Sequence, residues 1–267
     1  MGIGYTTILY DEASLEEGIA DIGACRYDGV EIGLEKIRAA GPENVSAWFE
    51  THDLELYCVM SGWFESDEDV EGFADDAETV AELGAQYYGL LPPQRGGTDD
   101  ETFAAWLETF CSAATDAGLV PVMHHHGATH VEQPDEIRRW LDEGPDSLEL
   151  LYDTAHYYPY GDELEGIERF ADDIAYVHLK DVDPGADFAE HTAALTSGEF
   201  HLDNVINYFR TFTDLGEGEI DFDAVARTLE DVGYDGHVTI EIENETERPL
   251  VHAKLNVDRW RESLAAQ

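Results

Sequence analysis

Short runs of apolar and β-branched residues alternate along the chain with longer segments in which apolar residues recur at helical spacing. This alternation is typical of parallel βαβ units, in which a helix returns the chain to the same edge of the sheet after each strand. The pattern predicts eight strands, at residues 3–9, 29–32, 54–60, 87–91, 120–124, 148–152, 174–179 and 237–242.

Between these strands lie amphipathic segments that we predict to be crossover helices. The first of them, residues 14–24, begins at Ser14 and carries Glu17 three residues later, which is the spacing of a capping box. One connection differs, because about forty residues, 181–220, follow the seventh strand, and a stretch of that length ordinarily is functional or forms short helices of its own.

The length of the chain agrees with this pattern. Its 267 residues contain no linker, repeat or low-complexity tract, and one (β/α)8 barrel typically needs about 250 residues. We therefore predict a single α/β domain, a TIM barrel that spans residues 1–267.

The charge balance is extreme, with 60 Asp and Glu against 14 Lys and Arg and a formal net charge of −46. At low ionic strength such a surface repels itself, whereas in molar salt the Debye length falls to about 3 Å. The acidic residues interleave with apolar ones at helical spacing, as in residues 73–83, which favours solvated helix faces over disorder. We interpret the composition as that of a protein from a halophilic cytoplasm.

Charge and cysteine content also limit the compartment and the partners. The acidic surface argues against nucleic acid and against an anionic membrane as partners. Cys25, Cys58 and Cys111 are odd in number and lack paired spacing, the N-terminus carries no signal-like segment, and no apolar run reaches the ~20 residues of a membrane span. We expect a cytoplasmic protein that acts on a small molecule, and a homo-oligomer is compatible with the sequence.

Residues that bind metals or transfer protons collect at the ends of four consecutive predicted strands, where barrels build their active sites. The fifth strand ends in three histidines, and alternation directs His124 and His126 to one face and His125 to the other. The sixth strand ends at Asp153, with His156 three residues later. The alternatives are a polar loop with chance histidines, and an N-cap role for Asp153.

The seventh and eighth strands add a cation and two carboxylates. His178 and Lys180 share a face at the end of the seventh strand. Because the chain has only three lysines, a lysine at this position suggests a functional role, and the alternative is a surface ion pair. Glu241 and Glu243 lie on the face opposite two isoleucines. In so acidic a chain a glutamate is usually exposed, yet a carboxylate inside a strand end is costly to bury without a cation.

Together, His124, Asp153, His178 and Glu241 supply two nitrogen and two oxygen ligands from adjacent strands. This set suits one divalent ion, with Mn²⁺ or Co²⁺ favoured and Zn²⁺ or Fe²⁺ compatible, and with positions left for water and substrate. Mg²⁺ fits less well because it prefers oxygen ligands.

Five short motifs carry a resemblance to a known superfamily: residues 123–127 (MHHHG), 152–156 (YDTAH), 177–181 (VHLKD), 216–222 (GEGEIDF) and 240–243 (IEIE). In this order they resemble the sugar phosphate isomerase/epimerase superfamily of xylose-isomerase-like barrels, and within it most closely the inosose dehydratases. The resemblance runs from His124 to the C-terminus, and in the N-terminal half only residues 28–31 (DGVE) share it.

The resemblance implies roles for individual residues. Asp153, His178 and Glu241 would be metal ligands, His156 would contact the substrate, and Glu31 would help to shape the substrate site. His124 stands where the ketose epimerases of the superfamily carry a second metal-bound glutamate.

Without that second glutamate, epimerisation by two acid–base groups on opposite faces of the substrate is disfavoured. Isomerisation or elimination of water fits better. Glu241 would then be the base beside the carbonyl of a keto sugar or keto-inositol. Lys180, His126 and Glu243 are the candidate acids, and Glu243 is also a candidate substrate contact.

Two other functions are compatible with the same fold. One is an abasic-site endonuclease, which resembles this chain in its Asp-Thr-x-His and His-Leu-x-Asp motifs. That family needs three zinc ions and histidines on the third and fourth strands, where this chain has Ser61-Gly62-Trp63 and Leu91-Pro92-Pro93. The other is a barrel that binds metal but has lost turnover, which substrate screening would distinguish from an enzyme.

The acidic surface predicts that stability depends on salt. Because counterions screen repulsion among the carboxylates, the melting temperature should rise steadily between about 0.1 and 3 M KCl. Differential scanning fluorimetry measures this directly. A melting temperature that stays flat across the range would contradict the halophilic interpretation.

Overall fold

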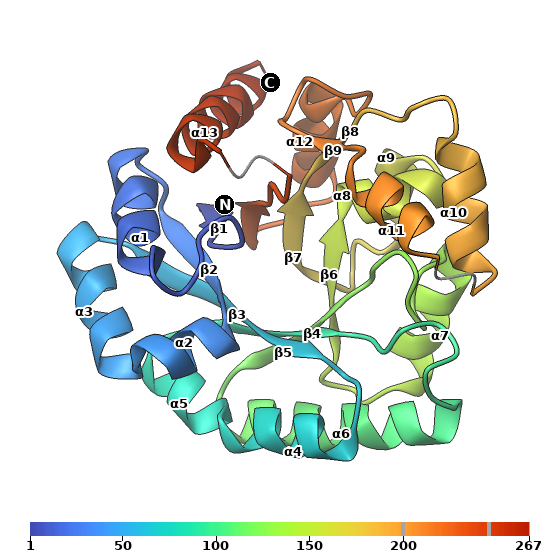
Figure 1. Cartoon of the computed structure of the whole chain (residues 1–267), viewed down its shortest axis with the longest axis horizontal. Coiled ribbons are helices and arrows are strands. Elements are labelled where there is room, and N and C mark those ends of the chain that lie inside the picture. The colour runs from blue at the N-terminus through green and yellow to red at the C-terminus, as the bar shows by residue number, and fades with distance from the viewer. Residues whose placement is uncertain (199–200, 245–246, 267) are drawn as a thin grey trace.

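A closed barrel of eight parallel strands forms the centre of the molecule (Figure 1). The computed structural model describes residues 1–198, 201–244 and 247–266. The barrel strands are β1 Ile3–Thr6, β2 Gly29–Gly33, β3 Glu55–Trp63, β4 Tyr87–Leu91, β5 Val120–His124, β6 Glu149–Asp153, β7 Ile174–Leu179 and β10 His237–Ile240. The predicted TIM barrel is confirmed.

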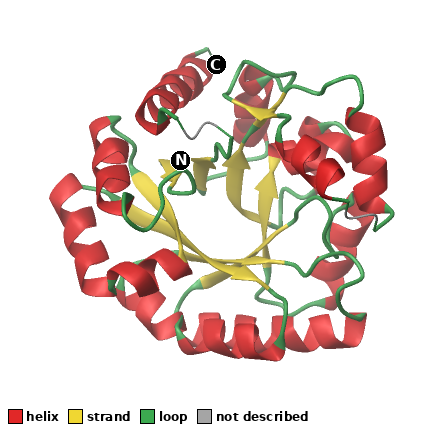
Figure 2. Cartoon of the chain, viewed as in Figure 1, coloured by secondary structure: helices red, strands yellow, loops and turns green. Residues whose placement is uncertain are grey.

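Helices surround the barrel on the outside, as the red ribbons around the yellow strands show (Figure 2). They are α1 Leu15–Ala24, α2 Leu34–Ala40, α3 Pro42–His52, α4 Asp67–Asp75, α5 Ala77–Glu82, α6 Asp100–Asp116, α7 Pro134–Glu143, α8 Thr154–Tyr157, α9 Glu163–Arg169, α12 Phe222–Asp231 and α13 Pro249–Ala265, with a 3-10 turn at Tyr158–Tyr160. Their buried apolar residues and the outer faces of the strands form one continuous core.

All eight predicted strands are present, and they differ from the prediction at their ends. The first strand ends at Thr6, because the chain turns there and the Tyr10 amide donates to the Thr7 carbonyl at 3.0 Å. The last ends at Ile240, yet the Glu241 amide still donates to the Leu179 carbonyl of β7 at 3.1 Å. Glu241 is therefore held against the barrel although it lies outside the strand.

The predicted capping box at Ser14 is wrong. Helix α1 does begin after Ser14, but the side chain of this residue makes no hydrogen bond to the helix backbone. Its hydroxyl instead donates to Asp11 Oδ1 at 2.6 Å, in the preceding turn. The competing local partner, three residues upstream, was not visible in the spacing that suggested the cap.

Alternation along the strands fills the barrel with an apolar floor and places polar groups above it. Val122, Leu151 and Tyr176 belong to a buried cluster inside the barrel, together with Tyr57, Cys58 and Tyr87. Two residues further along the same three strands come His124, Asp153 and His178, which therefore point into the same interior one layer nearer the mouth.

The long connection after β7 folds into structure of its own, as expected. It contains α10 (Phe188–Thr196), α11 (Leu202–Phe209) and a two-stranded antiparallel ribbon of β8 (Asp181–Val182) and β9 (Phe212–Thr213). Residues 199–200 of this predicted connection lie outside the described residues. Aromatic side chains of the connection contact the barrel mouth, since the Phe212 ring lies 5.1 Å from that of His156.

One buried carboxylate organises the end of this connection. Asp181 accepts hydrogen bonds from four backbone amides, those of Val182 and Ile220 at Oδ1 and those of Gly216 and Gly218 at Oδ2, over 2.8–3.1 Å. A Cβ on Gly218 would lie 2.3 Å from the Val182 carbonyl oxygen, so this close approach requires glycine.

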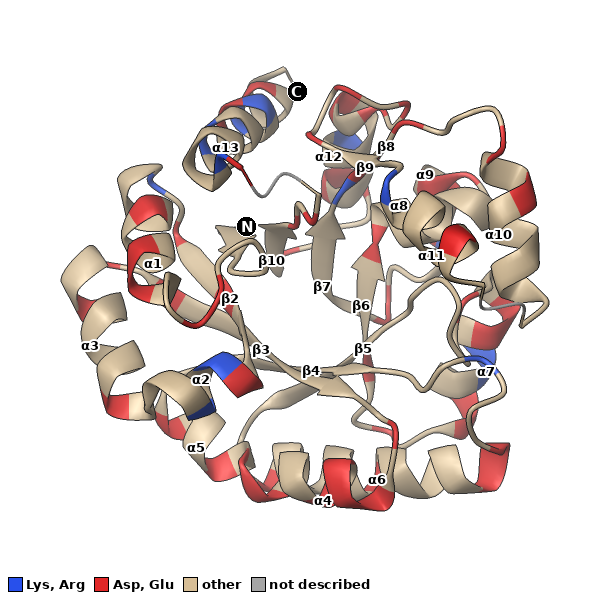
Figure 3. Ribbon diagram, in the orientation of Figure 1, with Lys and Arg blue, Asp and Glu red and all other residues tan. Residues whose placement is uncertain are grey.

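Acidic residues occur on the outer helices all around the ring, with few basic residues among them (Figure 3). Several arginines pair with acids of neighbouring elements, such as Arg138 with Asp173 at 2.5 Å and Arg139 with Asp100 at 2.7 Å. Such exposed pairs contribute only about 0–1 kcal/mol each, too little to offset the excess of negative charge. Among the described residues, no helix is long and apolar enough to cross a membrane.

Replacement of Asp181 tests its role in the connection. In Asp181→Asn one carboxylate oxygen becomes an NH2 group that faces backbone N–H donors, so the free energy of unfolding should fall by about 2–4 kcal/mol. Chemical denaturation in high salt measures the change. The exposed Asp183→Asn, two residues away, is the matched control and should change stability by less than about 0.5 kcal/mol; equal effects of the two variants would refute the assignment.

Candidate metal centre and active site

The four predicted metal ligands come together at the mouth of the barrel. One nitrogen or oxygen atom from each of His124, Asp153, His178 and Glu241 lies within 4.8 Å of the other three. All four side chains are buried, with at most 6% of any residue exposed. Each is the last residue of its strand, or lies within one residue of the strand end.

Their facing atoms have the arrangement of a ligand set. His124 Nε2 lies 3.4 Å from Asp153 Oδ2, and His178 Nδ1 lies 3.3 Å from Glu241 Oε2 and 3.7 Å from Asp153 Oδ2. A tetrahedral shell with ligands at 2.0–2.2 Å places them about 3.3–3.6 Å apart. Apart from one another and Lys180, these four buried atoms have no polar partner in the described part of the chain, so the residues present fit one divalent metal ion.

Asp153 serves the cluster and the helix that follows it. Its Oδ1 accepts hydrogen bonds from the amides of Ala155 and His156, at 2.8 and 2.9 Å, and so caps helix α8. Its Oδ2 faces the two histidines. The N-cap interpretation of this residue is therefore confirmed. Because a carboxylate has two oxygens, the cap leaves Oδ2 for a metal ion, and that role stays a prediction.

Glu31 lines the pocket and also contacts one of the predicted metal ligands. Its Oε2 lies 2.8 Å from His178 Nε2, and only 2% of the residue is exposed. This hydrogen bond leaves Nδ1 of the same ring directed at the cluster, which is the arrangement that orients a metal-binding histidine. Glu31 also lines the pocket, so contact with a substrate stays a prediction for this residue.

Positive charge is favoured at His178 but not at His124, whose pKa is lowered by burial. Burial alone would lower the pKa of His178, but the carboxylates of Glu31 and Glu241 raise it well above the usual value. Burial likewise opposes ionisation of Glu241, and Lys180 and His178 hold its pKa well below the usual range. A site that keeps carboxylates ionised out of water has a strong affinity for a cation.

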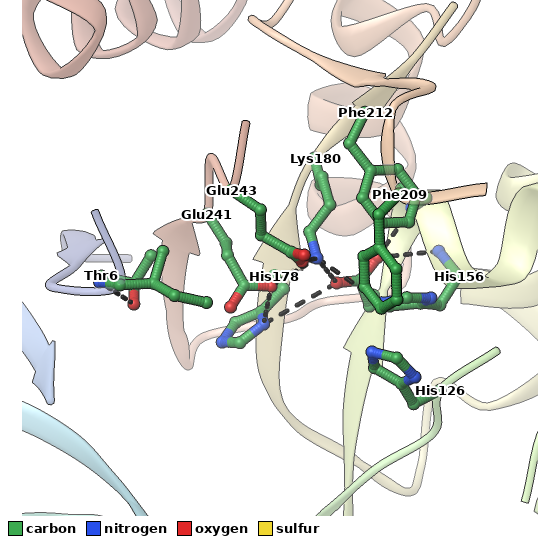
Figure 4. A network of polar contacts seen from close by, with 12 residues as sticks. Thr6, His126, His156, His178, Lys180, Phe209, Phe212, Glu241 and Glu243 are labelled. Carbon is green, nitrogen blue, oxygen red and sulfur yellow. Dashed lines mark hydrogen bonds and ion pairs between the residues drawn. The ribbon is translucent and has the colours of Figure 1, made fainter. Parts of the chain in front are cut away.

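Lys180 is fully buried rather than part of a surface ion pair. Its Nζ lies 2.5 Å from Glu241 Oε2 and 3.5 Å from Asp153 Oδ2, and it donates a hydrogen bond to Glu243 Oε1 (Figure 4). The same ammonium lies 4.7 Å from the centre of the Phe212 ring. Although burial lowers the pKa of Lys180, these carboxylates raise it well above the usual value, so the side chain is a cation.

His126 and His156 stack beside the cluster with ring centres 3.8 Å apart. His126 Nδ1 lies 2.7 Å from the Gly127 carbonyl and must donate to it, which leaves a lone pair on Nε2. Burial lowers the pKa of His126 to about 3. His126 is therefore an uncharged acceptor, and of the three candidate acids it is the one that this geometry disfavours.

His156 is buried behind His126, where its Nδ1 lies 3.0 Å from the Tyr208 hydroxyl. It is not among the described residues that line the pocket at the barrel mouth. Burial lowers the pKa of His156 well below the usual value. Its predicted contact with a substrate remains a prediction.

A pocket of about 360 Å³ opens over the cluster. His124, His178, Glu241 and Glu243 line its polar part, and its other lining residues include Ile8, Met60, Trp63, Leu91 and Phe209. The sequence did not identify Trp63 and Phe209 as functional. Trp63 ends the third strand, and its place at a strand end was a signal that could have identified it. Phe209 comes from the connection after β7, whose path only the structure reveals.

Comparison with known proteins shows the family. Residues 18–266 match the family of xylose isomerase-like TIM barrels, and the chain belongs to it. An inosose dehydratase of Yersinia enterocolitica is 34% identical over 258 residues, which cover 88% of this chain and 84% of the relative. An inosose dehydratase of Lacticaseibacillus casei is 29% identical over 260 residues, with the same coverage of each chain.

Solved structures share the barrel at low sequence identity. The IolI protein with a bound zinc atom aligns with a TM-score of 0.72 at 16% identity and covers all of this chain and 97% of its own. The 3-keto-D-glucoside 4-epimerase YcjR of E. coli aligns with a TM-score of 0.73 at 17% identity, over 100% of this chain and 97% of its own. These likenesses support the fold.

The metal centre predicts a graded loss of affinity. Asp153→Ala removes a ligand and should weaken metal binding by more than the about 10–100-fold that we expect for Glu31→Ala, which removes only the hydrogen-bond partner of the His178 ring. Dialysis against graded Mn²⁺ or Co²⁺ followed by elemental analysis measures occupancy per chain. The exposed Asp172→Ala is the control, and full occupancy with unchanged affinity in Asp153→Ala would show that this assignment is wrong.

Proposed function

We propose that this chain is a divalent-metal-dependent dehydratase of keto-inositols or closely related keto sugars. The observation that carries the proposal is the group of four buried ligand atoms that face one another beside a pocket that Glu241 and Glu243 also line. The relatives named inosose dehydratase support elimination of water as the outcome. Isomerisation would share the first proton transfer and differ in the second.

His124, Asp153, His178 and Glu241 would hold the ion. When bound, it would act as a Lewis acid that polarises the substrate carbonyl and so acidifies the neighbouring C–H bond. The mixed nitrogen and oxygen donors favour Mn²⁺ or Co²⁺ and are compatible with Zn²⁺ or Fe²⁺. A zinc atom in a solved relative of the same fold agrees with a divalent ion at this mouth.

Glu241 is the proposed base. Its Oε2 faces the metal cluster and Lys180, and the side chain lines the pocket, so its second oxygen is available for a substrate hydrogen. Lys180 and His178 hold its pKa well below the usual range and thereby keep it ionised, despite burial. The electron pair of the broken C–H bond becomes the new C=C bond, and the proton passes to the carboxylate.

Glu243 and Lys180 are the proposed acid, acting as a pair. Glu243 lines the pocket whereas Lys180 is enclosed behind it, and the two share a hydrogen bond. A proton can therefore reach the leaving hydroxyl through Glu243, with Lys180 beside it as the cation. The C–O bond breaks, the hydroxyl takes the proton and departs as water, and no external oxidant or reductant is needed.

Two variants separate the two proton transfers. In Glu241→Gln the base is lost, so exchange of the substrate α-hydrogen in heavy water should fall by about 100-fold or more. In Lys180→Met loss of the cation weakens the acid, so release of water should fall by a similar factor. Exchange should persist, because His178 and the added Mn²⁺ still favour the ionised form of Glu241. Mass spectrometry of recovered 2-keto-myo-inositol and absorbance of the unsaturated product measure the two steps.

Metal content and melting temperature of each variant are the controls, and Mn²⁺ is added until occupancy equals that of the wild type. Exchange at the wild-type rate in metal-loaded Glu241→Gln would mean that another group is the base. A wild-type protein that is fully loaded but neither exchanges nor dehydrates any keto-inositol or ketose would favour a barrel without turnover.

A further inference from the structure

Trp63 is exposed at the pocket although it is one of the largest apolar side chains in the protein. Of this residue 39% is exposed, whereas Trp106, Trp140 and Trp260 are at most 7% exposed. Within the described ranges its indole nitrogen has no hydrogen-bond partner. An indole kept half in water at the edge of a pocket is available to a ligand.

The backbone before Trp63 directs it there. The pairing of β3 with β4 shifts register between Met60 and Trp63, and Gly62 has a positive φ of 137°. A Cβ on Gly62 would also lie 3.0 Å from the Phe73 ring. Irregularities of this kind at a strand end redirect the following side chain and are frequent beside active sites.

Trp63 lies among other ring and apolar side chains at the pocket. Its ring meets the His126 ring edge-on, with centres 5.0 Å apart at 84°, and the Phe209 ring lies on His126 at 5.7 Å. Ile8, 46% exposed, lines the same pocket. The pocket thus combines these side chains with the polar groups of the metal cluster, so a ligand that fills it must offer both hydroxyl or carbonyl oxygens and an apolar surface.

We propose that Trp63 is a specificity-determining residue that stacks on the C–H face of a cyclic polyol while its oxygens face the metal cluster. The inference rests on the proposed function for the identity of the reacting ring. A ring with its hydroxyl groups around the rim exposes C–H bonds on its faces, and these are attracted to the negative face of an indole. An acyclic polyol has no such face.

The volume agrees with a single ring. A pocket of about 360 Å³ lies at the lower end of the range for small-molecule sites, roughly 300–1,000 Å³. It has room for one six-membered ring and its hydroxyl groups, and a longer saccharide would extend beyond it.

Binding is tested first by fluorescence of the metal-loaded protein. Myo-inositol, an unreactive cyclic probe, should shift the emission of the wild type and shield it from acrylamide, and the acyclic polyol mannitol should do so at least about 10-fold more weakly. Trp63→Phe should lose this signal. Trp48→Phe, at a partly buried tryptophan of α3 away from the pocket lining, is the matched control and should keep it.

Turnover of 2-keto-myo-inositol gives the second readout. Trp63→Ala should raise KM by about 10-fold or more with a much smaller change in kcat, and Trp63→Phe should recover most of the affinity, because a smaller ring still stacks. Metal content should be unchanged in both variants. Analytical ultracentrifugation should show the same oligomeric state as the wild type.

Three outcomes would overturn the proposal: an unchanged KM in Trp63→Ala, equal binding of myo-inositol and mannitol, or a changed oligomeric state, which would assign Trp63 to a subunit contact. Failure of myo-inositol to bind the wild type would overturn the stacking proposal as well. Turnover that is normal in the wild type and insensitive to Trp63 overturns the stacking proposal alone, whereas turnover lost only in Glu241→Gln leaves the proposed function standing.

Discussion

Asp153 and Glu241 hold ionised carboxylates out of water at the barrel mouth, and they can do so only beside positive charge. Lys180 supplies one charge from behind the cluster, at 2.5 Å from Glu241 Oε2 and 3.5 Å from Asp153 Oδ2. His178 supplies another when protonated, and its facing nitrogen is a ligand when it is not. A divalent ion among these atoms would complete the balance, which is why the four residues that fit a metal also include a glutamate, Glu241, that stays ionised despite burial.

Two of the four predicted ligands are held in place through their second polar atom. Asp153 caps helix α8 with Oδ1, and His178 is held by Glu31 through Nε2. The floor of the barrel contributes as well, because the hydroxyl of Tyr176, one layer below His178, is hydrogen-bonded to Thr239 of β10. The floor and the mouth layer of the barrel therefore both support these side chains, and the proposed proton transfers would need such fixed positions.

Charged residues on the outer helices and at the barrel mouth differ in how far salt screens them. On the outer helices the acidic residues are solvated, so their repulsion is moderated by salt and by the arginine pairs between helices. At the barrel mouth the charges are buried and ions in solution screen them little. Loss of screening should therefore affect the stability of the barrel before it affects the internal balance of the site.

The sequence by itself determined the strands, the barrel and the four clustered residues. Alternation along a strand is a local property, and parallel strands of a closed barrel all end at one rim, so residues such as His124 and Asp153 could be placed together without coordinates. Only the tertiary structure decided that Glu31 bonds His178, that Lys180 is enclosed behind Glu243, and that Ser14 does not cap its helix. Those outcomes depend on which side chains from distant segments meet, on the stagger between strands and on irregularities such as the shift before Trp63, none of which has a fixed spacing along the sequence.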